Sequence, residues 1–114
     1  MTYHEILQTF KDACPAVTSV VFCDGEGETI DFVTDVDSYH TQLLGAYQSD
    51  IVLRLKQIET QSGVLGRVEL RTETATIALW PVATGYYVVA LLRRGGVLPA
   101  PAVLAVTRTL EENL

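Results

Sequence analysis

The most regular pattern of hydrophobic and polar positions lies between Val64 and Leu92. Three short runs there are rich in Val, Ile, Thr, Tyr and Trp, and only Glu73-Thr74 and Ala83-Thr84-Gly85 separate them. No helical period fits these runs, and each is too short to span a membrane. Neighbouring runs joined by short turns pair at little cost in loop entropy. The stretch therefore predicts three antiparallel strands.

Two further strands are predicted nearer the N-terminus. The segments Thr18 to Cys23 and Thr29 to Val33 are β-branched and aromatic, and the turn from Asp24 to Glu28 separates them. Glycines in that turn allow the positive φ that tight turns need. We therefore expect a β-hairpin here.

An amphipathic helix is predicted at each end of the chain. At the N-terminus, Thr2 and Glu5 have the spacing of a capping box, and Pro15 marks the end of the helix. At the C-terminus, a helix is expected to start near Pro99 and Pro101. The apolar positions are Tyr3, Ile6, Leu7 and Phe10 in the first helix and Val103, Val106, Leu110 and Leu114 in the second. The first helix is expected to cover the sheet.

The longest helical pattern runs from Val36 to about Thr60. Its apolar residues occupy an arc of roughly 160° on a helical wheel, which is wider than a helix needs to cover one sheet. One interpretation is a single, very buried helix. The favoured interpretation is that half of the arc packs on the sheet and half on the helix of a partner. The expected dimer contacts are Leu43, Leu44, Tyr47, Ile51 and Leu55.

The first strand of the later three has one charged and one apolar face, because charged residues alternate with Val68, Leu70 and Thr72. If this strand is a sheet edge, its unpaired backbone groups are a template for a second copy of itself. Antiparallel pairing centred on Leu70 sets opposite charges against each other, whereas pairing centred on Glu69 sets Glu69 against Glu69. The expected dimer interface on this strand consists of Arg67, Val68, Glu69, Leu70 and Arg71 in the Leu70 register.

Composition narrows the class of protein. The chain has 114 residues, enough for one core without a metal or a disulfide, so residues 1–114 are expected to form one domain. Its net charge of −6 argues against nucleic acid and anionic membranes as partners. No apolar leader or anchor is visible, so no membrane insertion is expected. Cys14 and Cys23 are interpreted as reduced, buried thiols of a cytoplasmic protein.

Motifs for chemistry are absent from the sequence, so no catalytic, cofactor-binding or metal-binding residue is assigned. The two histidines, His4 and His40, have no acid or nucleophile at a useful spacing. The acidic turn resembles a calcium loop, but an EF-hand requires Gly and Glu at the positions of Thr29 and Asp35. Asp35 is instead interpreted as a charge that complements the dipole of the long helix.

One turn resembles a phosphate cradle. Arg93-Arg94-Gly95-Gly96 combines two cations with flexible backbone. No strand-to-helix phosphate loop accompanies it, so a solvated turn is the favoured interpretation.

The element order α-β-β-α-β-β-β-α resembles that of the Roadblock family, which includes the Roadblock-type dynein light chains and the bacterial MglB proteins. The resemblance rests on the hairpin VTSVVFCDGEGETIDFV, on the long apolar helix, and on GRVELRTETATIALWPVATGYYVVALL with its closing helix. It covers nearly the whole chain. It implies an α+β fold with a five-stranded antiparallel sheet of order 2-1-5-4-3, the long helix on one face and the terminal helices on the other.

The resemblance also implies a function. Roadblock proteins bind small Ras-like GTPases or act as scaffolds beside them, and MglB-type dimers activate a bacterial polarity GTPase. Two chains pair through the third strand, here expected at Leu65 to Thr72. We therefore expect a non-enzymatic homodimer, or a dimer with another Roadblock protein, that is a GTPase-activating protein or an adaptor in a bacterial polarity or motility system. No arginine matches a catalytic finger. The alternative is a PAS- or profilin-like module that senses a small molecule or binds a peptide.

Overall fold

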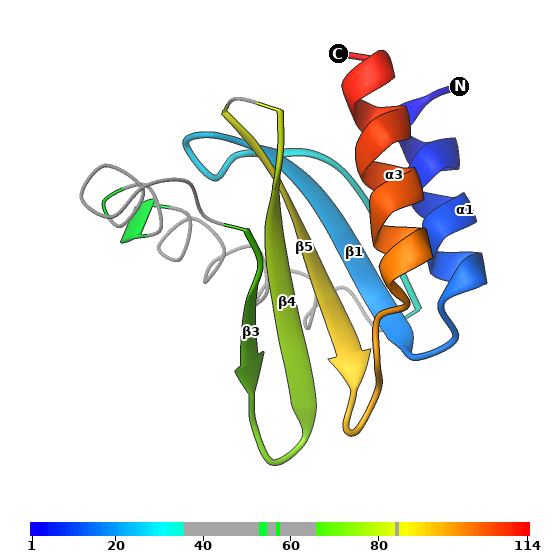
Figure 1. Ribbon diagram of the computed structural model, residues 1–114, viewed down its shortest axis with the longest axis vertical. Coiled ribbons are helices and arrows are strands. Elements are labelled where there is room, and N and C mark those ends of the chain that lie inside the picture. The colour runs from blue at the N-terminus through cyan, green and yellow to red at the C-terminus, as the bar shows by residue number, and fades with distance from the viewer. Residues whose placement is uncertain (36–52, 55–56, 58–65, 84) are drawn as a thin grey trace.

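The computed structural model describes residues 1–35, 53–54, 57, 66–83 and 85–114 (Figure 1). Five strands form one antiparallel sheet of order β2-β1-β5-β4-β3, which confirms the order predicted from the sequence. The elements are α1 (Tyr3–Ala13), β1 (Val17–Asp24), β2 (Thr29–Thr34), β3 (Val68–Arg71), β4 (Ala75–Val82), β5 (Tyr86–Arg93) and α3 (Ala100–Glu112).

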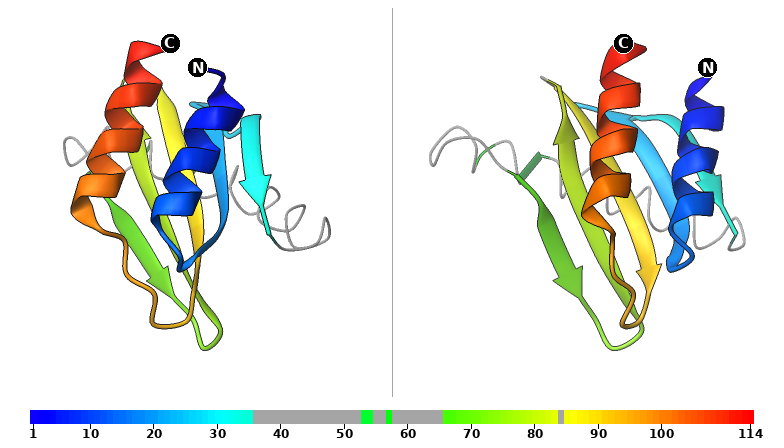
Figure 2. Two further views of the ribbon diagram at one scale, coloured as in Figure 1. Left: turned by 90° about the vertical axis from the view of Figure 1, so that its right-hand side faces the viewer. Right: turned by 45° about the vertical axis from the view of Figure 1, so that its right-hand side comes forward.

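Helices α1 and α3 lie side by side on one face of the sheet (Figure 2). The Oγ1 of Thr2 accepts a hydrogen bond from the backbone N–H of Glu5 at 3.1 Å, so the predicted N-cap is confirmed. Ile6, Leu7 and Phe10 are buried on the inner side of α1. This helix therefore covers the sheet, as its apolar period predicted.

Hydrogen bonds hold the helical layer in place. The Nε1 of Trp80 on β4 donates to Oγ1 of Thr107 on α3 at 3.0 Å. The hydroxyl of Tyr3 donates to the carbonyl of Asn113 at 2.9 Å, which joins the start of α1 to the end of α3. Buried indole N–H groups need an acceptor, so the first contact also sets how α3 lies across the sheet.

Alternation along the strands divides the core between the two faces. On the helix-covered face, Val20, Phe22, Trp80, Val88 and Ala90 pack with the apolar sides of α1 and α3. On the opposite face, a second cluster consists of Val21, Cys23, Leu79, Tyr87 and Val89, with Val68, Ile77 and Leu91 packed against it. We refer to this opposite face as the second face.

The predicted long helix lies almost entirely outside the described residues. Within that segment, Leu53, Arg54 and Gln57 are helical and exposed. Leu53 falls outside the apolar arc, so its exposure agrees with the predicted wheel. The predicted dimer contacts Leu43, Leu44, Tyr47, Ile51 and Leu55 all lie outside the described residues.

Both cysteines are buried thiols that form no disulfide, as predicted from the sequence. Burial raises the pKa of the Cys14 thiol. In the described residues, no helix is both long enough and apolar enough to cross a membrane.

Candidate functional site

Strand β3 forms one edge of the sheet, because its hydrogen bonds go only to β4. The register pairs Val68 with Leu79 and Leu70 with Ile77. At the hairpin end, the N–H of Thr72 donates to the carbonyl of Ala75 at 2.8 Å. Residues opposite each other in antiparallel strands alternate between hydrogen-bonded and non-bonded pairs. Val68 and Leu70 lie four and two residues before Thr72. Their backbone N–H and C=O groups are therefore the ones that form hydrogen bonds with β4.

The same alternation leaves other backbone groups of β3 pointing away from the sheet. Glu69 and Arg71 lie at the non-bonded positions, opposite Ala78 and Thr76. Their N–H and C=O groups face outward, and within the described part of the chain no element covers that side of β3. The outer edge of β3 is thus able to accept another strand.

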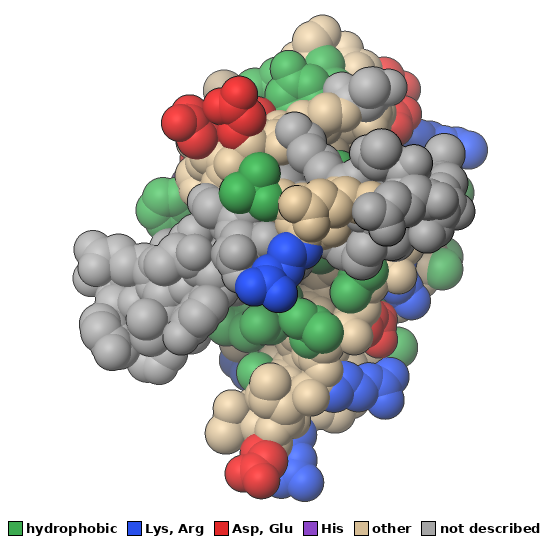
Figure 3. All heavy atoms as spheres, turned by 90° about the vertical axis from the view of Figure 1, so that its left-hand side faces the viewer, with side chains coloured by type: hydrophobic (Ala, Val, Ile, Leu, Met, Phe, Trp, Pro, Cys, Tyr) green, Lys and Arg blue, Asp and Glu red, His purple; other side chains and the backbone are tan. Residues whose placement is uncertain are grey.

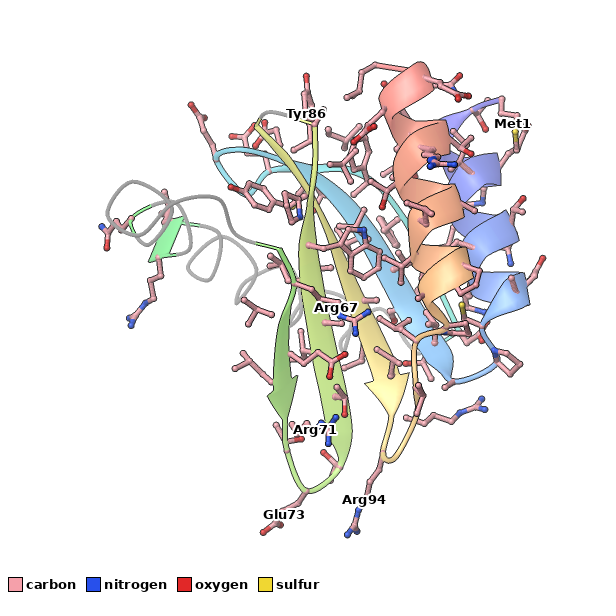
Figure 4. All side chains as sticks on the ribbon, viewed as in Figure 1. Met1, Arg67, Arg71, Glu73, Tyr86 and Arg94 are labelled. Atoms are coloured by element: carbon pink, nitrogen blue, oxygen red, sulfur yellow. The ribbon has the colours of Figure 1, made fainter. Side chains whose placement is uncertain are left out.

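The charged side chains of β3 form one connected row. Glu69 lies between two arginines, with its Oε1 3.5 Å from Arg67 and its Oε2 3.5 Å from Arg71. The opposite residue, Ala78, belongs to the helix-covered face, so the row lies on the side of the sheet that carries α1 and α3. Figure 4 labels both arginines along the open edge. Because these ion pairs are surface-exposed, each contributes only about 0–1 kcal/mol.

The other face of β3 is apolar. Val68 packs on the cluster of the second face, and Leu70 lies opposite Ile77 with 45% of its surface exposed. Figure 3 shows hydrophobic side chains gathered on this face. An exposed leucine beside a free strand edge is a surface that a partner would bury.

Solved structures of other proteins share this arrangement. MglB from Myxococcus xanthus superposes with a TM-score of 0.83 at 11% sequence identity, covering 97% of this chain and 93% of that one. The gliding protein MglB from Thermus thermophilus gives 0.81 at 8% identity, covering 96% and 86%. A Roadblock/LC7 domain from Streptomyces avermitilis gives 0.76 at 14% identity, covering 96% and 94%. No family model and no curated protein sequence matches the chain.

The chain has the Roadblock/LC7 fold. At these identities the likeness establishes the fold, and the predicted resemblance is confirmed at that level. The third strand is an edge of this sheet, as the Roadblock resemblance implied. The site residues assigned to β3 therefore lie together on one edge, whereas those of the long helix lie outside the described residues.

The edge strand is shorter than expected. The sequence predicted a strand from Leu65 to Thr72, but β3 spans Val68–Arg71. Thr72 belongs to the turn, where its Oγ1 accepts from the N–H of Ala75 at 3.1 Å. At the other end, Pro81 of β4 lies at the position that would pair with Gly66, and proline has no N–H to donate. Arg67 therefore precedes the strand while its side chain still pairs with Glu69.

The described residues do not bring side chains together in a metal-binding or catalytic arrangement. No group of three or more His, Cys, Asp or Glu side chains there is placed to hold a metal ion. His4 is exposed on α1, with its Nδ1 3.7 Å from a carboxylate oxygen of Asp31. His40 lies outside the described residues. The best-defined candidate site is therefore an interaction surface on β3.

Proposed function

We propose that this chain is a non-enzymatic Roadblock-type module that dimerises through β3 and binds or regulates a small Ras-like GTPase. The observation that supports it is the set of outward backbone groups on Glu69 and Arg71, in a chain with the fold of MglB. One MglB structure among those compared has a tetrameric arrangement. Association of this chain through its free edge is consistent with that precedent.

The charges favour the register centred on Leu70, and the outward backbone groups are compatible with it. In the register centred on Leu70, Glu69 lies opposite Arg71 of the second copy, and both residues have outward N–H and C=O groups. The pair would exchange two backbone hydrogen bonds, and the two-fold symmetry would repeat it. Each net hydrogen bond contributes about 0.5–1.5 kcal/mol, so the strand alone makes a weak dimer. We propose that Leu43, Leu44, Tyr47, Ile51 and Leu55 supply the remaining, apolar contact.

The proposed regulation places the chemistry on the GTPase. No catalytic residue of this chain is proposed, so an effect on GTP hydrolysis would come from ordering the catalytic loops of the GTPase itself. An adaptor would bind the same partner without changing its hydrolysis rate. The GTPase would bind either a homodimer of this chain or a dimer of this chain with another Roadblock protein.

Sedimentation equilibrium tests the dimer. We expect the 12.5 kDa chain to reach twice its mass at micromolar concentration. A chain that remains a monomer at about 100 μM would contradict dimerisation, because obligate assemblies of this kind bind far more tightly.

Hydrolysis assays with purified small Ras-like GTPases test the partner. The GTP- and GDP-loaded forms are each incubated with the protein, and binding and phosphate release are measured. Faster hydrolysis indicates a GTPase-activating protein, and nucleotide-dependent binding at an unchanged rate indicates an adaptor. A Glu69→Pro variant controls for the role of the dimer. Failure of both nucleotide states to bind, with the parent protein shown to be dimeric, would exclude the GTPase part of the proposal.

A further inference from the structure

A polar cavity of about 300 Å³ opens between the β3–β4 hairpin and the loop that follows β5. Its walls are Arg71, Thr72, Thr76, Arg94, Gly95, Gly96 and Val97. Three separate parts of the fold contribute: β3 and its turn, β4, and the turn after β5. The volume is at the lower end of the range for small-molecule sites in proteins.

Two arginines are among the residues that line this cavity, and in Figure 4 the side chain of Arg94 extends outward from its loop. Arg71 is on β3 and Arg94 is on the turn after β5, and Figure 4 shows both at the same end of the sheet. Arg94 has no carboxylate within 4.0 Å among the described residues, and Arg71 shares Glu69 with Arg67 at 3.5 Å. Glu73 also lies at this end of the sheet, but it makes no ion pair within 4.0 Å with a described residue, so Arg94 stays available to an anion.

Thr76 supplies a second, independent feature. Only 7% of its surface is exposed, it lines the cavity, and its hydroxyl makes no hydrogen bond to any described residue. The residue pairs with Arg71 across the β3–β4 ladder, so its side chain is on the same face as the charged row. Buried hydroxyls nearly always have a partner, because leaving one unpaired is unfavourable. A ligand oxygen in the cavity would provide that partner.

The loop wall is held close to the sheet by glycine. A Cβ on Gly96 would lie 2.6 Å from Cβ of Ala16 and 2.9 Å from the carbonyl of Arg93, so no larger residue fits. Gly95 has φ of 75°, a conformation that glycine adopts without strain. The turn is closed by a hydrogen bond from the N–H of Gly96 to the carbonyl of Arg93 at 2.9 Å, and Gly96 packs closely against Ala16 while Arg94 and Gly95 are exposed.

We propose that this cavity binds the phosphate group of a small phosphate monoester. Guanidinium groups bind phosphate by paired, charge-assisted hydrogen bonds, and the Thr76 hydroxyl adds a donor from the floor. Val97 on the rim is 77% exposed and offers an apolar contact for the organic part. The site shares Arg71 with the proposed dimer edge, whereas Thr76 and Arg94 lie off the edge strand, so variants at these two positions test the cavity separately from the dimer.

Titration with phenyl phosphate, followed by amide NMR spectra of the full chain, tests the proposal. We expect saturable shifts of the Gly95 and Gly96 amide signals with a Kd of about a millimolar or below. Binding should weaken below pH 6, since the second pKa of a phosphate monoester is about 6 and the dianion is the form bound. Phenyl sulfate stays a monoanion. It should therefore bind several-fold more weakly than phenyl phosphate, because it makes weaker charge-assisted hydrogen bonds.

Variants locate the site. Arg94→Gln and Thr76→Val should each raise the Kd for phenyl phosphate about tenfold, because each removes one donor. Arg108→Gln is the matched control, since Arg108 is exposed on α3 and does not line the cavity, and its Kd should equal that of the parent. The proposal is overturned if phenyl phosphate gives no saturable shifts, or if Arg94→Gln binds it as well as the parent does. Sedimentation of the same samples shows separately whether the protein is dimeric.

Discussion

The two edges of the sheet are built in opposite ways. Strand β2 ends the sheet on one side and β3 ends it on the other, and both are short. Free strand edges promote unwanted pairing, so proteins protect them with bulges, charges or a covering element. β2 has all three protections, whereas β3 has only charges in the described part of the chain.

A helix and an irregularity in strand pairing both protect the edge formed by β2. Helix α1 packs alongside β2, and a bulge interrupts the β1–β2 register between Phe22 and Cys23. The side chain of Lys11 is buried and forms an ion pair with Asp35, just after β2. A bulge bends the edge, and the helix contact and the ion pair tie β2 to α1, so these features disfavour pairing with a second strand.

The carboxylate of Asp31 also blocks the outer backbone of β2. The N–H of Asp35 donates to the carbonyl of Thr18 at 2.8 Å, so the alternation places the N–H of Phe32 on the outward side. An Oδ1 of Asp31 accepts that N–H at 2.8 Å. The charged side chains of β3 instead pair with each other, and the outward N–H groups at Glu69 and Arg71 are left available. The contrast supports the proposal that β3 pairs with a partner strand.

The largest effect is expected from removing an inward hydrogen bond of β3. Leu70→Pro deletes the N–H that bonds to Ile77, so the β3–β4 ladder loses a bond and leaves the carbonyl of Ile77 unpaired. We expect the free energy of unfolding to fall by about 2 kcal/mol or more, measured by urea denaturation at a concentration where the protein is monomeric. Leu70→Ala, which keeps the N–H, should lose much less. Equal losses would mean that position 70 does not bond to β4.

The next largest effect is expected from removing a backbone N–H of β3 that points away from the sheet. Glu69→Pro removes an N–H that β4 does not use, and proline is tolerated at such a position on an edge strand. We expect a folded protein whose self-association weakens about 10- to 100-fold, because two symmetric hydrogen bonds are lost. Sedimentation velocity measures the change, and Glu69→Gln controls for the charge. A Glu69→Pro protein with parental association would place the dimer contact elsewhere.

Opening the protected edge is expected to have a smaller effect. Asp31→Ala frees the outward N–H of Phe32 and removes the contact with His4. Loss of that local hydrogen bond should destabilise the fold by about 0.5–1.5 kcal/mol and produce species larger than the parent assembly at high concentration. Asp31→Asn keeps an oxygen acceptor and should preserve the parental mass distribution in light scattering. An Asp31→Ala protein with the same stability and mass distribution as the parent would show that the bulge and α1 protect the β2 edge without Asp31.

Local patterns accounted for most of the fold. The cap at Thr2, the apolar period of α1 and the hairpin turns each depend on residues a few positions apart, so the sequence predicted them. The position of β3 at the edge followed from the Roadblock resemblance, and its charge alternation was used only to predict the pairing register. The end of that strand was missed because it depends on Pro81, which lies on the neighbouring strand.

Groups brought together by the tertiary structure were harder to foresee. Asp35 was interpreted as a charge at the start of the long helix, which lies outside the described residues, and the sequence did not show that its carboxylate forms an ion pair with Lys11 of α1. The turn at Arg94 was interpreted as solvated because no phosphate loop accompanies it, and Arg94 and Gly95 are indeed exposed; what the sequence did not show is that the turn and Thr76 line one cavity. Periodicity shows which side of an element is buried but not which distant residue it meets.

The smallest effect distinguishes the two registers of the open edge. In the Leu70 register, Glu69→Lys sets a lysine against Arg71 of the second copy, and the double variant Glu69→Lys with Arg71→Glu restores opposite charges. Each cross-strand pair contributes about 0.2–1 kcal/mol, so dimerisation should weaken a few-fold in the single variant and recover in the double one. In the Glu69 register, the single change replaces one like-charge pair by another and leaves the association constant nearly unchanged. Sedimentation of both variants at low salt, where surface charges are least screened, therefore identifies the register, provided that added salt reduces the difference between them.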